Sequence, residues 1–310
     1  MVLLIEKIAK HCYFKLENRQ HSITRPQPEQ LSSSSLLAFK SHVSKSIDQL
    51  TSDLKARSET LSLTWFGRCL ALLPLINKAF AKLVADMDYP MSKWEVGLTE
   101  GYLSYTLSLL DLLNSISSCL SHLGQARMSL AHGLNLLENS PSLARKHLKG
   151  IQFQPGGFST NCGKDLSKAR VFSDKENMVH EAVKEMRSIG FWVCGVMLSG
   201  LYGDEKTYME LRKIAGGFDS SLVATLDFKI SEQFMEKTSI FSEIKEVNDA
   251  VADLVASDKV RYDVVTELQT KLRLLENLSD NISMEVDNLF ANVMAQRSKL
   301  IDGFRLQRQQ

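Results

Sequence analysis

The sequence predicts an all-α protein, an elongated bundle of long antiparallel helices that ends in a heptad-patterned helical hairpin. Apolar residues recur every three or four positions over most of the chain, which places them on one face of a helix. Only 6 Pro and 16 Gly occur among 310 residues, so few positions interrupt long helices. No segment alternates apolar and polar residues as a half-buried strand does.

The composition divides the chain into four segments. Residues 1–35 are predicted to form a flexible amino terminus and linker, because prolines and a run of serines follow a short apolar start. Residues 36–149 should form an amino-terminal helical sub-bundle. Residues 150–172 contain four glycines, Pro155 and scattered Ser, Thr and Asn, and they are expected to form a mobile linker. Residues 173–310 should form a carboxy-terminal helical sub-bundle that packs on the first.

Two amphipathic helices are expected to open the amino-terminal sub-bundle. The first begins at Leu36, and its apolar face consists of Leu36, Phe39, Val43, Ile47, Leu50 and Leu54. The second covers about residues 61–87 and contains Trp65, which we interpret as a core residue. Pro74 removes a backbone hydrogen bond within this helix, so we expect a kink there.

A turn at residues 88–90 precedes the next predicted helices. Ser92 and Glu95 have the spacing of a capping box, which predicts a helix of about thirty residues that ends near Gly124. A shorter helix should cover residues 126–139. Pro141 then suits the first turn of another helix.

The carboxy-terminal sub-bundle is expected to start with a second capping box, formed by Ser173 and Glu176. The following run, Ser188–Gly203, contains no charged residue. We interpret it as a buried core helix, because a membrane span needs about twenty apolar residues. A membrane-embedded hairpin or a short span is the alternative. The amino terminus is a second candidate for membrane contact, because Leu4 and Ile8 lie among lysines.

A heptad repeat marks the last part of the chain. One seam consists of Leu268, Leu275, Ile282 and Leu289, which lie seven residues apart, and the other of Leu272, Val286, Val293 and Leu300, with Ser279 as its one polar residue. The preceding segment has apolar residues at Ile240, Ile244, Val247, Val251 and Leu254. Two such helices with a short connection predict an antiparallel hairpin.

No catalytic, cofactor-binding or metal-ligating residue is predicted, and no cofactor is expected. The segment Gly157–Lys164 departs from a phosphate-binding loop in its glycine spacing and in having Asp165 where the motif has Ser or Thr. Glu176, His180 and Glu181 lie close together on a predicted helix. A di-iron bundle requires Glu-x-x-His pairs that the sequence lacks, so we interpret these three residues as an exposed charged face.

The net charge indicates which partners the protein is expected to lack, and the cysteine content indicates the redox state of its compartment. The net charge is +1, and basic residues do not interleave with aromatic residues, so no nucleic-acid partner is expected. The five cysteines are odd in number and lack metal-ligand spacing, which is typical of a reducing compartment without structural disulfides. We interpret Cys69, Cys119, Cys194, Trp94 and Trp192 as core residues. The sequence predicts a cytoplasmic protein, with peripheral membrane association as the alternative, rather than a plastid or integral membrane protein.

Several patches resemble the plant BYPASS family over about residues 36–305. They comprise Thr64-Trp65, the turn from Asp88 through Pro90 to Ser92-Lys93-Trp94-Glu95, Tyr102-Leu103, Leu109–Asn114, Leu134–Glu138 before Ser140-Pro141, and Glu285-Val286-Asp287 with Phe290 and Arg297. The resemblance implies a plant regulator of root and shoot development that restrains a mobile root-derived signal. It also implies exocyst subunits as partners, since relatives are linked to exocytic vesicle traffic. No catalytic residue is implied.

The residues and the resemblance together leave three hypotheses about the function of the protein. The leading hypothesis is a non-enzymatic interaction protein that presents helix faces to protein partners. The first alternative is a membrane-associated vesicle-trafficking factor that contacts lipid through Ser188–Gly203 or the amino terminus. The second alternative is a small-molecule enzyme or carrier that uses a cavity in the bundle. The sequence does not predict an oligomeric state.

Overall fold

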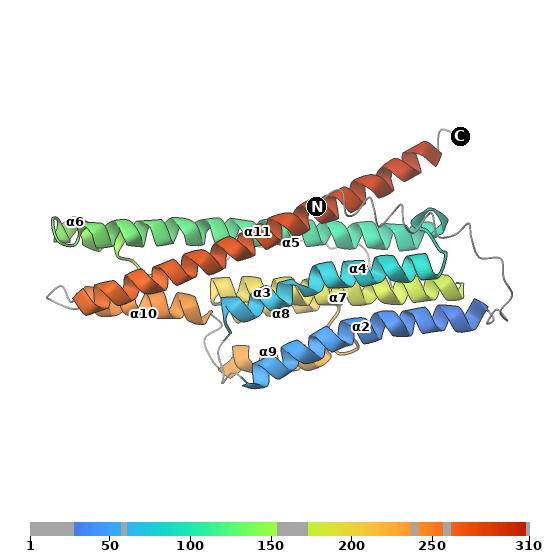
Figure 1. The fold of residues 1–310 in the computed structure, drawn as a ribbon, viewed down its shortest axis with the longest axis horizontal. Coiled ribbons are helices and arrows are strands. Elements are labelled where there is room, and N and C mark those ends of the chain that lie inside the picture. The colour runs from blue at the N-terminus through green and yellow to red at the C-terminus, as the bar shows by residue number, and fades with distance from the viewer. Residues whose placement is uncertain (1–27, 57–60, 154–172, 237–240, 257–261, 308–310) are drawn as a thin grey trace, which may run out of the picture.

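The structure is a computed structural model that describes residues 28–56, 61–153, 173–236, 241–256 and 262–307. Almost all of these residues lie in helices, and none of them lies in a strand. The long helices run roughly along the long axis of the molecule (Figure 1). The predicted fold class, an elongated all-α bundle, is confirmed.

The described helices follow one another along the chain, and the helix α7 lies at the centre of their arrangement. They are α2 (Pro28–Ala56), α3 (Leu63–Leu70), α4 (Leu72–Asp86), the short 3-10 helix η1 (Met91–Lys93), α5 (Val96–Leu136), α6 (Pro141–His147), α7 (Asp174–Tyr202), α8 (Glu205–Ala215), α9 (Ala224–Glu236), α10 (Ser242–Ala256) and α11 (Tyr262–Gln307). The helices α2, α3, α4, α5 and α8 all contact α7. In Figure 1, α11 runs obliquely across α5, and α10 lies along the first part of α11.

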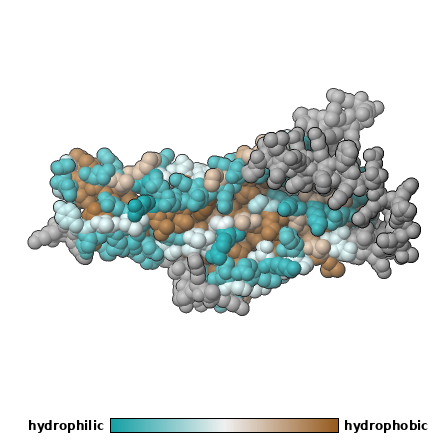
Figure 2. Space-filling model, in the orientation of Figure 1, coloured by the Kyte–Doolittle hydropathy of each residue, from teal (hydrophilic) through white to brown (hydrophobic). Residues whose placement is uncertain are grey.

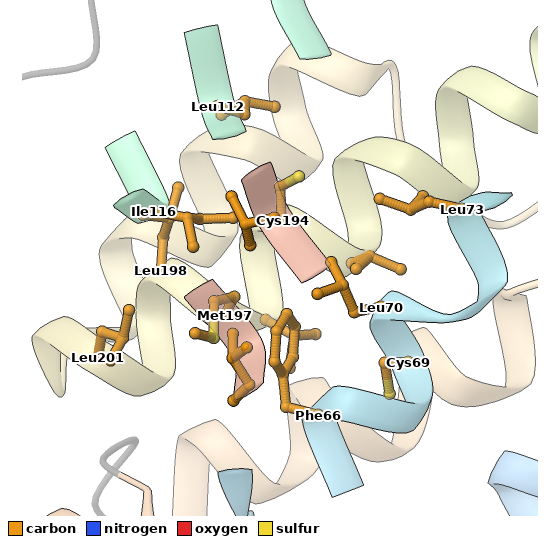
Figure 3. Packing of buried hydrophobic residues seen from close by; sticks show 14 of the residues in the cluster. Phe66, Cys69, Leu70, Leu73, Leu112, Ile116, Cys194, Met197, Leu198 and Leu201 are labelled. Carbon is orange, nitrogen blue, oxygen red and sulfur yellow. The ribbon is translucent and has the colours of Figure 1, made fainter. Parts of the chain in front are cut away.

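The uncharged run Ser188–Gly203 forms the second half of α7 and is core, as predicted. From Ser188 to Leu201 every residue is buried. Figure 3 shows Cys194, Met197 and Leu198 of this helix among buried side chains of α3, α4 and α5. No helix in the described part of the chain is long and apolar enough to cross a membrane.

Glycines in α7 allow neighbouring helices to pack against its backbone. A Cβ atom at Gly195 would lie 3.3 Å from the ring of Tyr208 in α8. A Cβ atom at Gly190 would lie 2.9 Å from the hydroxyl oxygen of Tyr105 in α5. These contacts confirm that small residues let other helices approach closely.

Aromatic and cysteine side chains fill the core as the sequence predicts. Trp65, Trp94 and Trp192 are all buried, and the rings of Trp65 and Trp192 meet edge to face with centroids 6.3 Å apart. Cys69, Cys119 and Cys194 are buried and form no disulfide. Burial raises the pKa of the Cys194 thiol to about 12, so this thiol remains protonated and behaves as a small apolar group.

The heptad seams of α11 are buried, which confirms the pattern. Leu275 and Val286 are fully shielded from solvent, and Ser279 is buried within the second seam. The helix α10 contacts α11, so the predicted hairpin is present, but α5 also packs extensively on α11. The ion pairs Lys271–Glu246 (3.4 Å, to α10) and Arg127–Glu276 (2.8 Å, to α5) lie on these two sides.

The amino-terminal helix begins earlier than predicted. The helix α2 starts at Pro28 rather than Leu36, so the predicted linker is helical from Pro28 onward. Proline suits a first helical turn, and the helix is stabilised by the packing of its apolar face further along the chain. That face is confirmed, because Phe39, Val43 and Ile47 are buried.

The predicted kink near Pro74 is present as an interruption between α3 and α4 at Ala71. Pro74 has no backbone N–H to donate to the carbonyl of Leu70, so one hydrogen bond of a continuous helix is missing. The backbone N–H of Ala71 still donates to the carbonyl of Gly67 (3.2 Å). The chain therefore keeps a helical hydrogen bond at Ala71, although the helix is interrupted there.

Two predictions about α5 are wrong. Ser92 does not cap this helix, because it lies in η1, where the N–H of Trp94 donates to the carbonyl of Met91 (3.2 Å). The helix starts at Val96, and the Glu95 side chain does not cap it. Nor does α5 end at Gly124. It continues to Leu136, because one glycine costs only about 1 kcal/mol in a helix whose apolar face continues beyond it.

The capping box of Ser173 and Glu176 and the first-turn position of Pro141 are confirmed. The predicted linker 150–172 needs correction at its start. Asn248 of α10 accepts a hydrogen bond from the N–H of Ile151 (2.6 Å) and donates one to its carbonyl (3.0 Å), so this residue is anchored. Residues 154–172, with the Gly157–Lys164 segment, lie outside the described residues, as does the amino terminus before Pro28. The division into two sub-bundles stays a prediction.

Candidate functional site

A cavity of about 490 Å³ lies where α4, η1, the start of α5 and the last part of α11 meet. Its wall combines apolar and polar side chains from all four elements. The lining residues are Asn77, Phe80, Ala81, Val84, Met91, Ser92, Tyr102, Gln296, Lys299 and Leu300. This volume is in the range of small-molecule sites in proteins.

The rings of Phe80 and Tyr102 form the aromatic base of the cavity, and Trp94 packs on both of them. The rings of Phe80 and Tyr102 stack with centroids 5.9 Å apart, and Trp94 meets both rings edge to face. The indole N–H of Trp94 donates to the carbonyl of Tyr89 (3.2 Å), which fixes the turn before η1. The base is therefore rigid and mostly apolar.

The Tyr102 hydroxyl is the polar group at this base. Burial raises the pKa of Tyr102 to about 12, although nearby Arg297 opposes this shift. The hydroxyl is therefore neutral at physiological pH and can donate a hydrogen bond. It lies 3.5 Å from Oε1 of Gln296, which is the outer limit for such a bond.

Arg297 ties α11 to α5 beside the cavity. Its guanidinium donates to the carbonyl of Leu103 and to the hydroxyl of Thr106, the latter at 2.6 Å. Burial lowers the pKa of Arg297, which remains charged because its ordinary pKa is far above neutrality. The two hydrogen bonds fix the position of the last described turns of α11.

Arg297→Met is expected to lower the free energy of unfolding by about 2 kcal/mol, because it leaves a buried carbonyl and hydroxyl of α5 with one partner fewer. Urea unfolding followed by circular dichroism measures this. The control is Lys299→Met, which removes a neighbouring exposed cation that forms no ion pair with a described residue. If both variants unfold at the same urea concentration as the parent, Arg297 does not hold α11 in place.

Glu176 is buried, which corrects the prediction of an exposed charged face. It accepts hydrogen bonds from the Tyr89 hydroxyl (3.0 Å) and from the backbone N–H of Ser173 (3.1 Å). Burial, followed by the hydrogen bond to Glu176, raises the pKa of Tyr89 to about 12. Glu181 is exposed and pairs with Lys40 of α2 (2.9 Å). Within the described ranges, no three His, Cys, Asp or Glu residues lie close enough to hold a metal ion.

Two grooves lie on either side of α3 at the surface of the molecule. One groove of about 330 Å³ lies between α3 and α11 and is lined by Leu63, Thr64, Gly67, Arg68, Ala71, Leu278, Asn281, Ile282 and Glu285. The other, of about 250 Å³, lies between α3–α4 and α2 and is lined by Ser46, Gln49, Leu50, Asp53, Arg68, Ala71, Leu72 and Leu75. We call the two grooves and the strip between them the α3 face. Figure 2 shows a brown hydrophobic band on this side of the molecule, where Figure 1 places α11 next to α3.

The α3 face carries two acidic residues and one basic residue, and only one of the acids is paired with the base. The Arg68 guanidinium donates to the carboxylate of Asp53 and is thereby neutralised. Glu285 is an exposed residue whose partial burial raises its pKa, and it forms no hydrogen bond or ion pair with a described residue. The groove between α3 and α11 therefore has an uncompensated carboxylate.

The structure brings together residues from separate family-like patches, although none of them was predicted as a site residue. Thr64 and Glu285 line the groove between α3 and α11, while Ser92 and Tyr102 line the cavity. Sequence analysis missed Phe80 and Lys299, because the cavity forms only where distant helices meet. The patches that contain Ser92 and Arg297 lie close together in the fold, and helical periodicity in the sequence could not predict that contact.

Comparison with known proteins finds relatives in plants. The chain is 26% identical over 295 residues to "Protein BPS1, chloroplastic" of Arabidopsis thaliana, a match that covers 86% of this chain and 82% of that protein. It is 24% identical over 262 residues to UPF0496 protein 4 of Oryza sativa subsp. japonica. It is 25% identical over 176 residues to the protein of the same name from subsp. indica.

The two rice matches are partial. They cover 76% and 51% of this chain, but only 58% and 39% of the rice proteins. No protein-family model and no solved structure matches the chain. The Arabidopsis match spans most of both chains and confirms the resemblance found in the sequence patches. The chain is therefore related to the BYPASS family of plant developmental regulators.

Proposed function

We propose that the protein is a non-enzymatic regulator of plant root and shoot development that binds partner proteins through the α3 face. The single observation that carries the proposal is the open groove between α3 and α11, which has an apolar strip and one exposed carboxylate, that of Glu285. The resemblance to the BYPASS family supports the developmental role. It also supports the finer proposal that the protein restrains a mobile root-derived signal. We propose that it acts in the cytoplasm or at a membrane surface, although the Arabidopsis relative is named as chloroplastic.

The shape of the α3 face fits a helical partner. Gly67 has no atom within 4 Å of a Cβ position, and Thr64 and Ala71 are small and exposed on the same strip. Small residues let the backbone of a partner helix approach closely. An amphipathic helix can place its apolar side in such a groove, with anchors one turn apart.

Charge further specifies the partner. Glu285 is exposed at the groove, forms no ion pair with a described residue, and has a pKa that partial burial raises. A Lys or Arg of the partner would supply the opposite charge and would favour the ionised carboxylate. Arg68 also lines the groove, but its charge is paired with Asp53, so Glu285 is the acidic residue of this groove that a partner cation can contact. The proposed partner segment is therefore an amphipathic helix with a basic residue that faces Glu285. Exocyst subunits are the proposed candidates, on the resemblance alone.

Affinity purification of the tagged full-length protein from plant roots, followed by mass spectrometry, tests the proposal. Glu285→Lys places like charges together, and Ala71→Trp fills both grooves from an exposed position. Each change should deplete the specific co-purifying proteins at least about tenfold. The matched control is Asp280→Lys, a charge reversal of an exposed residue on α11 that does not line either groove. It should leave the set of partners unchanged.

A growth assay gives a second readout. In plants that lack the gene, the parent and Asp280→Lys should restore root and shoot growth, and Glu285→Lys should not. If Glu285→Lys and Ala71→Trp retain the same co-purifying proteins as the parent and restore growth, the α3 face does not carry the function.

A further inference from the structure

We infer that the cavity between α4, η1, α5 and α11 binds a single-chain lipophilic carboxylic acid, with its apolar body on the aromatic base and its carboxylate between Lys299 and Tyr102. This site is separate from the α3 face, so the inference does not depend on the proposed function. The cavity has the size of a small-molecule site, a mostly apolar wall and two polar groups that can hold an anion.

Size and apolar lining define the body of the ligand. The cavity measures about 490 Å³, and Phe80, Val84, Met91 and Leu300 supply apolar wall. A ligand that covers these side chains removes apolar surface from water, which is the main source of affinity in such sites. Because Trp94 supports Phe80 and Tyr102 through edge-to-face contacts, the base does not need to rearrange on binding.

Charge defines the head group. Among the described residues that line the cavity, Lys299 is the only charged one and none is acidic. The side chains of Asn77, Ser92 and Gln296 are neutral and polar. An apolar site with one cation favours an amphiphile with one negative charge over a neutral or cationic one.

Tyr102 supplies a directional donor to the same head group. Its hydroxyl is neutral and makes only a long contact of 3.5 Å with Gln296. A carboxylate oxygen accepts a stronger, charge-assisted hydrogen bond from a hydroxyl, and this bond can replace the long contact. Lys299 and Tyr102 thus provide a charge and a donor for the two oxygens of one carboxylate.

The test is a displacement titration with the full-length protein at neutral pH. A dansyl-labelled undecanoic acid serves as the fluorescent probe, and dodecanoate and dodecanol serve as competitors with equal chain length. The parent should bind the probe saturably at one site. Dodecanoate should displace it at a concentration at least about tenfold lower than dodecanol, because only the acid carries the charge.

Two variants place the site. Lys299→Gln should weaken dodecanoate binding about tenfold and remove most of its advantage over dodecanol. Ala81→Trp should abolish probe binding, because it puts an indole into the cavity from an exposed position on α4. The matched control is Lys82→Gln, which removes an exposed cation next to Ala81 that does not line the cavity. It should bind like the parent.

Several results would overturn the inference. They are absence of saturable probe binding by the parent, equal displacement by dodecanol and dodecanoate, and an equal loss of affinity in Lys82→Gln and Lys299→Gln. Unchanged probe binding by Ala81→Trp would place the acid elsewhere on the protein. Should Ala81→Trp fail to fold, Lys299→Gln decides alone, because it changes an exposed side chain. None of these results affects the partner binding assigned to the α3 face.

Discussion

Gly200→Ala is expected to lower the free energy of unfolding by about 3 kcal/mol, because the new methyl group has no space. A Cβ atom at Gly200 would lie 2.5 Å from Cζ of Phe241. The Phe241 ring cannot move aside easily, since it is fully buried and packs on Phe66 with centroids 6.1 Å apart. The backbone is held as well, because the N–H of Phe241 donates to the carbonyl of Gly200 (3.1 Å).

Gly124→Ala is the matched control for this prediction. Gly124 is also a helical glycine, but no atom lies within 4 Å of a Cβ position there. The same substitution should therefore raise the free energy of unfolding by up to about 1 kcal/mol, because alanine favours the helix. Urea unfolding followed by circular dichroism compares the two. Equal stability of both variants would mean that α7 and the segment at Phe241 are not in contact.

Leu275→Asp is expected to cost about 4 kcal/mol or more, or to prevent folding. Leu275 is fully buried in the first heptad seam of α11. An aspartate there either leaves a carboxylate without water or a cation, or must become protonated, and both outcomes destabilise the folded state. Ile282→Asp in the same seam should behave alike, because that side chain is 3% exposed.

The neighbouring residue provides the control for the seam. Leu274 lies on the same helix but is 51% exposed. Leu274→Asp should therefore change the free energy of unfolding by no more than about 0.5 kcal/mol. Thermal melts of Leu275→Asp and Leu274→Asp compare the buried seam with the solvent side of α11. If both melt like the parent, the seam faces water and the packing of α11 on α5 and α10 is wrong.

The sequence predicts the parts of this fold that depend on helical periodicity. The seam residues Leu275 and Val286 are buried because a seven-residue repeat keeps one face toward its neighbours. The uncharged run around Trp192 is core because a helix that is apolar on all sides must be covered on all sides. Such patterns determine which face is buried, but not which helix covers it. The contact of α11 with α5 could not be predicted for this reason.

Local signals failed where tertiary contacts outweighed them. Gly124 does not end α5, because the helix continues to bury Leu130 and Leu134 beyond it. Ser92 has the spacing of a helix cap, but Trp94 is fixed by its own contacts with Phe80 and Tyr102, so the chain forms a 3-10 turn first. In both cases the energy of burying side chains exceeds the preference of one residue.

The candidate sites were beyond sequence analysis because each lies between helices that are distant in the chain. Lys299 reads as one more exposed cation on a polar face until the structure places it beside Phe80 and Tyr102. Glu285 similarly reads as one more acid on a polar face, and only the structure places it in a groove beside α3, where partial burial raises its pKa. The family-like patches at Thr64 and Arg297 indicated important positions without indicating what they contact.

Site-specific photo-crosslinking tests the central claim, which is that the α3 face binds a helical partner protein. A small diazirine amino acid at Ala71, which borders both grooves, should give a discrete cross-linked product in plant cells. The partner peptide in that product should be an amphipathic helical segment with a Lys or Arg, and Glu285→Lys should abolish the product. The same amino acid at Gly124, outside the α3 face, should give none. Identical products at both positions, or none at Ala71, would contradict the claim.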